Sequence, residues 1–197
     1  QERKAAGCEW LQSKDETAQF EVTSNPEFLR EGCAVGDFLQ GDRVVVGANT
    51  EQAAKLMKEV YQNLDSEYIE TDVHSAELIK YASNAFLAVK ISFINEISRL
   101  CELVGADVEK VALGMGSDSR IGNKFLHAGA GYGGSCFPKD TSALVDIAQK
   151  VGYNFKIVQS AIEVNKEQRT FVFEKLKKML DGELEGKKIG FWGLAFK

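Results

Sequence analysis

The sequence predicts an α/β segment followed by a mainly α-helical domain that is organised around one long helix. Three consecutive valines between Asp42 and Gly47 are typical of a buried strand, and a helical pattern follows from Asn49. Beyond Asp72, apolar residues recur at alternating three- and four-residue steps as far as Val104, which indicates a single long helix. The first part therefore reads as the tail of an α/β domain.

The other elements are predicted in chain order. Phe20–Thr23 is a candidate short strand, ended by the turn-forming Ser24-Asn25-Pro26. The helix from Asn49, capped by that residue or by Thr50, would bury Ala53, Leu56, Met57 and Val60. The long helix would pack its apolar stripe against other helices or against a second copy of the chain; the stripe comprises Ile79, Ala82, Phe86, Val89, Phe93, Ile97, Leu100 and Val104.

Three more helices and a long loop complete the second part. The helices are expected from Asp107 to about Gly114, from Pro138 to Val151 and from Ile157 to Leu180, and a glycine-rich loop covers residues 117–135. Lys187–Phe196 then begins a new strand. Since the chain ends on that strand and does not start with Met, we expect it to be a piece of a longer protein.

Composition excludes several classes of function. A net charge of −5 argues against a nucleic-acid partner, and no apolar run reaches membrane-spanning length, so a soluble cytoplasmic protein is expected. The two histidines and four cysteines fit no metal-binding spacing. Cys8, Cys33 and Cys101 are interpreted as structural thiols.

The fourth cysteine, Cys136, lies in the strongest local motif, G-A-G-Y-G-G-S-C-F-P-K-D from Gly129. Four glycines in six residues allow a backbone to approach a ligand closely, and Pro138 suits the first turn of a helix. A thiol at a helix start is favoured as the thiolate, with Lys139 adding positive charge and Asp140 one turn away. The alternative is an inert cysteine in a tight structural loop.

Two further pairs could carry chemistry. Lys80 and Asn84 share one face of the long helix and could stabilise a developing oxyanion, although such pairs are common on solvated faces. Glu27 and Glu31 follow a turn after the first candidate strand, where carboxylates could exchange protons or hold hydroxyl groups. The alternative is a solvated first helical turn, where acidic residues suit the helix dipole.

Taken together, these segments resemble the UDP-glucose/GDP-mannose dehydrogenase family. The resemblance rests on six motifs in the family's order: S-N-P-E-F-L-R-E-G from Ser24, D-R-V-V-V-G from Asp42, A-E-L-I-K-Y-A-S-N from Ala76, D-S-R-I-G-N-K-F-L from Asp118, G-Y-G-G-S-C-F-P-K-D from Gly131 and G-L-A-F-K from Gly193. It implies a Rossmann-like NAD-binding remainder over 1–72, a helical central dimerisation domain over 73–184, and the first strand of a nucleotide-sugar-binding domain over 185–197.

The resemblance also implies a reaction. The family oxidises UDP-glucose to UDP-glucuronate by two NAD-dependent steps, and the residue matching Cys136 captures the aldehyde as a thiohemiacetal that becomes a thioester. Lys80 and Asp140 would manage the proton and order a water, Asn84 would hold the reacting oxygen, and Glu27 would act in hydrolysis. A homodimer through the long helix is implied as well.

The roles of the remaining site residues are implied only by their matching positions in the family's motifs. NAD contacts fall on Glu31, Cys136, Phe137, Pro138 and Lys139. Substrate contacts fall on Glu27, Phe28, Leu29, Arg30, Lys80, Asn84, Arg120, Phe125, Leu126, His127, Tyr132, Gly133, Phe196 and Lys197. Arg120 corresponds to an arginine that the family lends across a dimer interface.

The sequence departs from the family in lacking the glycine-rich dinucleotide fingerprint, so we expect negligible turnover from this chain alone. Three alternatives stay open: a dehydrogenase of another nucleotide sugar such as GDP-mannose, a two-electron hydroxyacid dehydrogenase, and a non-catalytic helical dimerisation module.

Overall fold

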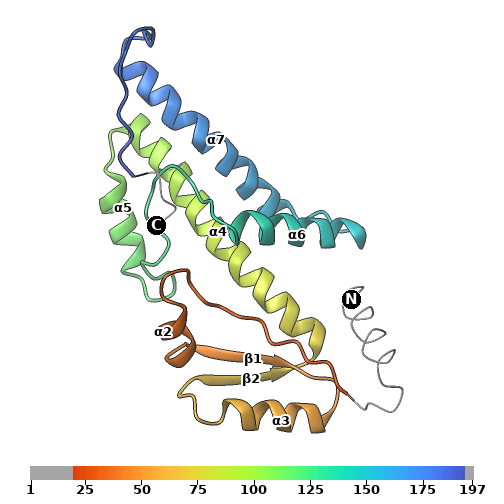
Figure 1. The fold of residues 1–197 in the computed structure, drawn as a ribbon. Helices are drawn as coiled ribbons and strands as arrows, with labels where there is room; N and C mark the ends of the chain where they lie inside the picture. The colour runs from red at the N-terminus through yellow and green to blue at the C-terminus, as the bar shows by residue number, and fades with distance from the viewer. Residues whose placement is uncertain (1–19, 194–197) are drawn as a thin grey trace. The chain divides into compact units, whose positions relative to one another are not determined.

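The computed structural model describes residues 20–193, which fall into two compact units (Figure 1). The first unit runs to Lys80 and the second begins at Tyr81, so the division lies within the long helix α4 (Val73–Val104). The structure confirms both the α/β character of the first part and the helical character of the second.

The first unit is built on a parallel strand–helix–strand arrangement. Strand β1 (Arg43–Gly47) pairs in parallel with β2 (Glu67–Thr71), and α3 (Glu51–Tyr61) connects them. The valines at 45 and 46 are fully buried, as the apolar run of β1 predicts. Strand β2 was not predicted, because glutamates at its first and fourth positions interrupt the apolar pattern that marks a buried strand.

The predicted cap of helix α3 is confirmed, but part of its predicted buried face is wrong. The Thr50 side chain accepts a 3.2 Å hydrogen bond from the backbone N–H of Ala53. Ala53 and Ala54 are buried, whereas Leu56 and Val60 are 55% and 69% exposed, so their predicted burial is wrong. The small residues let α3 approach β1 closely, and a two-stranded sheet is too narrow to cover the wider apolar face.

The segment before β1 also differs from the prediction. Phe20–Thr23 forms no strand; instead Ser24 exchanges two backbone hydrogen bonds of 2.8 and 2.7 Å with Gly47. A short helix that was not predicted, α2 (Ala34–Leu39), follows. At Gly47 a side chain is excluded by crowding, because a Cβ would lie 2.7 Å from both the Ala76 Cβ and the Asp72 carbonyl oxygen.

Helix α4 has its predicted length but buries the opposite face. Its buried positions in the second unit carry mostly small or polar residues: Ala85, Ala88, Ser92, Ile94, Asn95, Ser98 and Cys101. Of the predicted apolar stripe, Phe86, Phe93, Leu100 and Val104 are instead exposed, at 65%, 47%, 53% and 67%, whereas Ile79, Val89 and Ile97 are half-buried. Small side chains permit close helix packing, which explains why this face lies inward.

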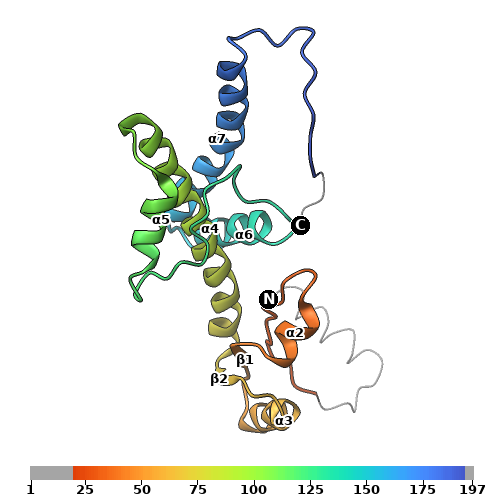
Figure 2. The same cartoon turned by 90° about the vertical axis from the view of Figure 1, so that its left-hand side faces the viewer.

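The helices that follow α4 in the chain confirm the predicted order. They are α5 (Val108–Gly116), α6 (Phe137–Lys150) and α7 (Lys156–Met179), and the stretch between α5 and α6 is irregular as expected. A cluster of Ala85, Leu144 and Val158 joins α4, α6 and α7. The ribbons of these three helices meet in Figure 2. Asp107 caps α5 through bonds of 2.9 and 3.4 Å from the amides of Glu109 and Lys110.

The predicted strand at the end of the chain is absent from residues 187–193, and its last part lies outside the described residues. A strand needs a neighbour to accept its backbone hydrogen bonds, and no strand within residues 20–193 pairs with this segment. No helix within the described range is long and apolar enough to cross a lipid bilayer.

Candidate active site

Cys136 occupies the N-cap position of α6 and is exposed to solvent. Its backbone is helical, at φ −92° and ψ −60°, and its carbonyl accepts a 2.8 Å bond from the amide of Asp140. The Ser135 hydroxyl lies 3.7 Å from the Cys136 sulfur. The prediction that Pro138 stands in the first helical turn is confirmed, so the thiol lies where a helix favours negative charge.

Asp140 lies in the first turn of α6 and is buried, with only 2% of its surface exposed. Asn84 Nδ2 on α4 donates a 2.5 Å hydrogen bond to Asp140 Oδ2, and Lys139 Nζ lies 3.5 Å from Oδ1. A buried carboxylate requires such partners. The second unit thus contains an exposed thiol and a fixed acidic group on adjacent turns of one helix.

Lys80 and Glu27 form a separate contact in the first unit. Lys80 Nζ donates to the backbone carbonyl of Glu27 and, at 3.1 Å, to its carboxylate. The other carboxylate oxygen accepts a 2.7 Å bond from the amide of Leu29. The Phe28 ring centroid is 5.4 Å from Lys80 Nζ and 4.1 Å from Arg43 Cζ. The structure therefore brings Glu27, Phe28 and Lys80 together.

Arg30 is turned toward a partner that the sequence did not suggest. Its side chain donates bonds of 2.9 and 2.6 Å to Asp37 on α2, and its amide donates a third at 2.8 Å. These contacts with Asp37 raise the pKa of Arg30. Glu31 is exposed in the turn that leads into α2.

Arg120 is likewise engaged locally, with 87% of its side chain exposed. It binds both carboxylate oxygens of Asp118, at 3.0 Å through Nε and 2.6 Å through a terminal nitrogen, which lowers the pKa of Asp118. Lys90 on α4 holds the following turn by donating bonds of 3.1 and 3.3 Å to the carbonyls of Ile121 and Gly122. This role of Lys90 was not predicted.

The glycine-rich loop packs aromatic rings against the helix that carries the thiol. The Phe125 and Tyr132 rings meet the Phe137 ring edge-on, with centroids 6.2 and 6.0 Å apart. Leu126 and Tyr132 are buried, and burial raises the pKa of Tyr132. His127 is exposed and Gly133 is half-buried. Of these predicted substrate residues, Phe125 and Tyr132 therefore pack against the start of α6, whereas His127 lies at the surface.

Three buried carboxamides that were not predicted hold this loop: Asn95 on α4 and Asn165 and Gln168 on α7. Each is at most 4% exposed. In the sequence they are polar residues at inward positions of amphipathic helices. They can be recognised as such only once the inward face of each helix is known.

The predicted site residues therefore form two described groups, one around Lys80 and one around Cys136, while Arg30 and Arg120 pair with carboxylates outside these groups. Lys80 and Asn84 lie one helical turn apart along α4. Phe196 and Lys197 lie outside the described residues. Within residues 20–193, no cluster of three or more His, Cys, Asp or Glu side chains could hold a metal ion.

Comparison with known proteins gives a consistent result. Residues 4–65 match the NAD binding domain of the UDP-glucose/GDP-mannose dehydrogenase family, and residues 74–167 match the central domain of that family. The chain is 54% identical over 178 residues to UDP-glucose 6-dehydrogenase TuaD of Bacillus subtilis, which covers 90% of this chain and 38% of the relative. It is 46% identical over 187 residues to the UDP-glucose 6-dehydrogenase of Rickettsia felis, covering 93% and 42%.

Solved structures agree. A UDP-glucose dehydrogenase from Pyrobaculum islandicum superposes with a TM-score of 0.85 at 40% identity, over 88% of this chain and 40% of that one. A UDP-D-ManNAc dehydrogenase from Pyrococcus horikoshii gives a TM-score of 0.76 at 26% identity, over 91% and 43%. The chain spans about two fifths of the length of the curated relatives that it matches.

Proposed function

The chain belongs to the UDP-glucose/GDP-mannose dehydrogenase family, and we propose that it is the part of a UDP-glucose 6-dehydrogenase that carries the catalytic thiol. The observation that carries the proposal is the exposed thiol of Cys136 one helical turn from the buried Asp140, which Asn84 holds at 2.5 Å. On this proposal the chain comprises a Rossmann-like remainder (1–72), the central domain (73–184) and the start of a third domain (185–197).

NAD, when bound, would accept one hydride in each of the two oxidations, so two NAD molecules would be consumed for each substrate. The described first unit supports such a cofactor site through its parallel β1–α3–β2 arrangement, which is the building block of dinucleotide-binding sheets. The proposed contacts from this chain are Glu31, Cys136, Phe137, Pro138 and Lys139. Because the sequence contains no glycine-rich dinucleotide turn, we propose that this chain functions within a longer polypeptide.

Cys136 would act on the aldehyde that the first oxidation produces. Its sulfur adds to the aldehyde carbon as a thiolate, which gives a thiohemiacetal, and loss of a hydride converts this adduct to a thioester. Water then releases the carboxylate of UDP-glucuronate and regenerates the thiol. Covalent capture retains the aldehyde between the two oxidations.

The other groups would handle charge and protons. The Lys80 ammonium and the Asn84 amide would stabilise negative charge on the reacting oxygen. Asp140 would hold a proton or a water next to the thiol, and Glu27 would assist hydrolysis as an acid or base. The contact of Lys80 with the Glu27 carboxylate, 3.1 Å, supports their pairing in proton transfer.

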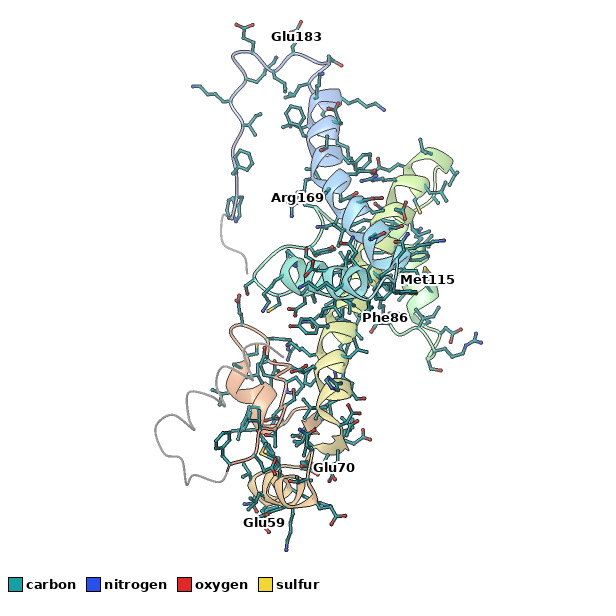
Figure 3. All side chains as sticks on the ribbon, turned by 90° about the vertical axis from the view of Figure 1, so that its right-hand side faces the viewer. Glu59, Glu70, Phe86, Met115, Arg169 and Glu183 are labelled. Carbon is teal, nitrogen blue, oxygen red and sulfur yellow. The ribbon has the colours of Figure 1, made fainter. Side chains whose placement is uncertain are left out.

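The proposed substrate contacts otherwise come from two stretches and the end of the chain: Phe28, Leu29, Arg30, Arg120, Phe125, Leu126, His127, Tyr132, Gly133, Phe196 and Lys197. The exposed apolar stripe of α4, on which Phe86 is labelled in Figure 3, supports a homodimer through that helix. Arg120 would then serve the neighbouring copy.

The test counts NADH formed per UDP-glucose in a polypeptide that joins this chain to its dinucleotide-binding and nucleotide-binding parts. We expect two NADH from the unaltered protein, two from Cys33→Ala, which alters another exposed thiol, and at most one from Cys136→Ala. A yield of one from the unaltered protein would indicate a two-electron dehydrogenase. Sustained NADH production by the isolated 197-residue chain would contradict the proposed division of the site.

A further inference from the structure

The loop before Cys136 is held by side chains on two helices. At Gly129, the amide donates a 2.8 Å bond to Asn95 Oδ1 on α4, and the carbonyl accepts a 2.7 Å bond from Gln168 Nε2 on α7. At Tyr132, Asn165 makes both bonds: Oδ1 accepts from the amide at 2.7 Å and Nδ2 donates to the carbonyl at 3.0 Å. All four backbone polar groups at these two positions are therefore satisfied by carboxamides.

These carboxamides are built into the fold. Asn95, Asn165 and Gln168 are 0%, 4% and 3% exposed, so loss of a bond would leave a buried polar group without its partner. Arg99 Nε donates a 2.9 Å bond to Gln168 Oε1, which orients the amide so that Nε2 faces Gly129. Asn165 also lies so close to Gly131, whose φ is +102°, that a Cβ there would collide with its Oδ1.

The backbone at Cys136 has hydrogen bonds of its own within α6. Its carbonyl is held by the amide of Asp140 at 2.8 Å, and the Thr141 hydroxyl donates a 2.7 Å bond to the carbonyl of Phe137. These contacts belong to α6 itself. The three carboxamides therefore act on the loop, whereas the helix holds the thiol.

We propose that Asn95, Asn165 and Gln168 form a carboxamide clamp that positions the Gly129–Gly133 backbone to receive the nucleotide sugar. The clamp residues are positioning residues: they set the loop conformation without touching substrate. The role in substrate binding rests on the proposed function, whereas the effect on the loop is measurable in this chain without any ligand.

Hydrogen exchange in this chain tests the clamp directly. Asn165→Asp and Gln168→Glu keep shape and acceptor but lose the donor, and each turns a carboxylate oxygen toward a backbone carbonyl. Gln149→Glu adds the same charge at an exposed position of α6 and is the matched control. We expect the Gly129 and Tyr132 amides to exchange about tenfold faster in the two clamp variants, a factor that corresponds to ~1.4 kcal/mol.

Core amides decide whether the effect is local. Those of Leu144 and Val158, in the cluster that joins the helices, should keep their protection in both clamp variants. Unchanged exchange at Gly129 and Tyr132 relative to Gln149→Glu would overturn the proposal. Equal acceleration at Leu144 and Val158 would overturn it too, since the carboxamides would then support the fold as a whole and not the loop.

Kinetics of the longer polypeptide test the positioning role. We expect KM for UDP-glucose to rise about tenfold in each clamp variant with kcat changed less than about threefold. Alkylation of Cys136 by iodoacetamide should stay within about twofold of the unaltered rate, because α6 holds the thiol. Faster exchange with an unchanged KM would refute the positioning role. Failure of Cys136→Ala to lower the NADH yield would refute the proposed function while leaving the exchange results standing.

Discussion

Asn84 Nδ2 donates a 2.5 Å hydrogen bond to Asp140 Oδ2, which joins the long helix α4 to the helix that begins at Cys136. Asp140 is only 2% exposed, so this amide and Lys139 Nζ, at 3.5 Å, are the described partners that stabilise its carboxylate. The bond links the element that carries the exposed thiol to the central scaffold of the second unit.

Exchanging the two partners tests this bond. Asn84→Asp sets two carboxylates side by side and Asp140→Asn sets two amides side by side, so each should lower the free energy of unfolding by ~1–3 kcal/mol. The double variant restores one donor and one acceptor and should recover most of that loss. Urea denaturation of the four proteins gives the comparison; losses that simply add in the double variant would show that the residues do not interact.

The free energy of unfolding depends on pH through Asp72, which immediately precedes α4. Its side chain accepts a 2.9 Å bond from the amide of Ser75, and hydrogen bonds from the side chain and then the amide of that serine lower the pKa of Asp72 from 3.8 to about 2. Because the folded state holds the carboxylate more strongly, this stabilisation is present above pH 4 and is lost as the pH falls toward 2.

The measurement compares urea midpoints of the unaltered chain and Asp72→Asn between pH 5 and 2. The difference between them should shrink as the pH falls through that window, since a neutral amide does not titrate. Ser75→Ala, which removes the main partner, should flatten the dependence in the same manner. A constant difference across the window would contradict the assignment.

Crowding at Gly47 predicts that even the smallest added side chain lowers the free energy of unfolding. Gly47→Ala would bring a Cβ within 2.7 Å of the Ala76 Cβ and the Asp72 carbonyl oxygen, so we expect a loss of ~1–3 kcal/mol in the free energy of unfolding. Gly36→Ala is the control, because a Cβ there meets nothing within 4 Å and alanine favours its helix. Equal stability of the two variants would show that the backbone at Gly47 can move away.

The exposed stripe of α4 predicts self-association. We expect the chain to sediment as a dimer and Phe93→Glu to sediment as a monomer, because a charge on that stripe opposes burial of its apolar face. Phe173→Glu on α7 is the matched control, since Phe173 is 49% exposed and Phe93 is 47% exposed. If both variants sediment alike, α4 is not the contact.

Local chemistry accounts for what could be predicted. The valines of β1, the Thr50 cap, and Pro138 after Cys136 act within a few residues of themselves, and each predicted its element correctly. Strand β2 escaped prediction because its parallel pairing with β1 is a long-range contact that compensates for a weak local pattern.

The sequence by itself determined the approximate ranges of helices α3 to α7, the family, and the presence of a thiol at a helix start. Tertiary structure alone decided which face of α4 is buried, because periodicity reveals an apolar stripe but not what packs against it. Small residues at Ala85 and Ala88 allow the close approach of neighbouring helices, so the bulky stripe through Phe86 and Phe93 faces outward. The same packing brings Asn95, Asn165 and Gln168 to one loop, a contact between positions 33 to 39 residues apart in the chain.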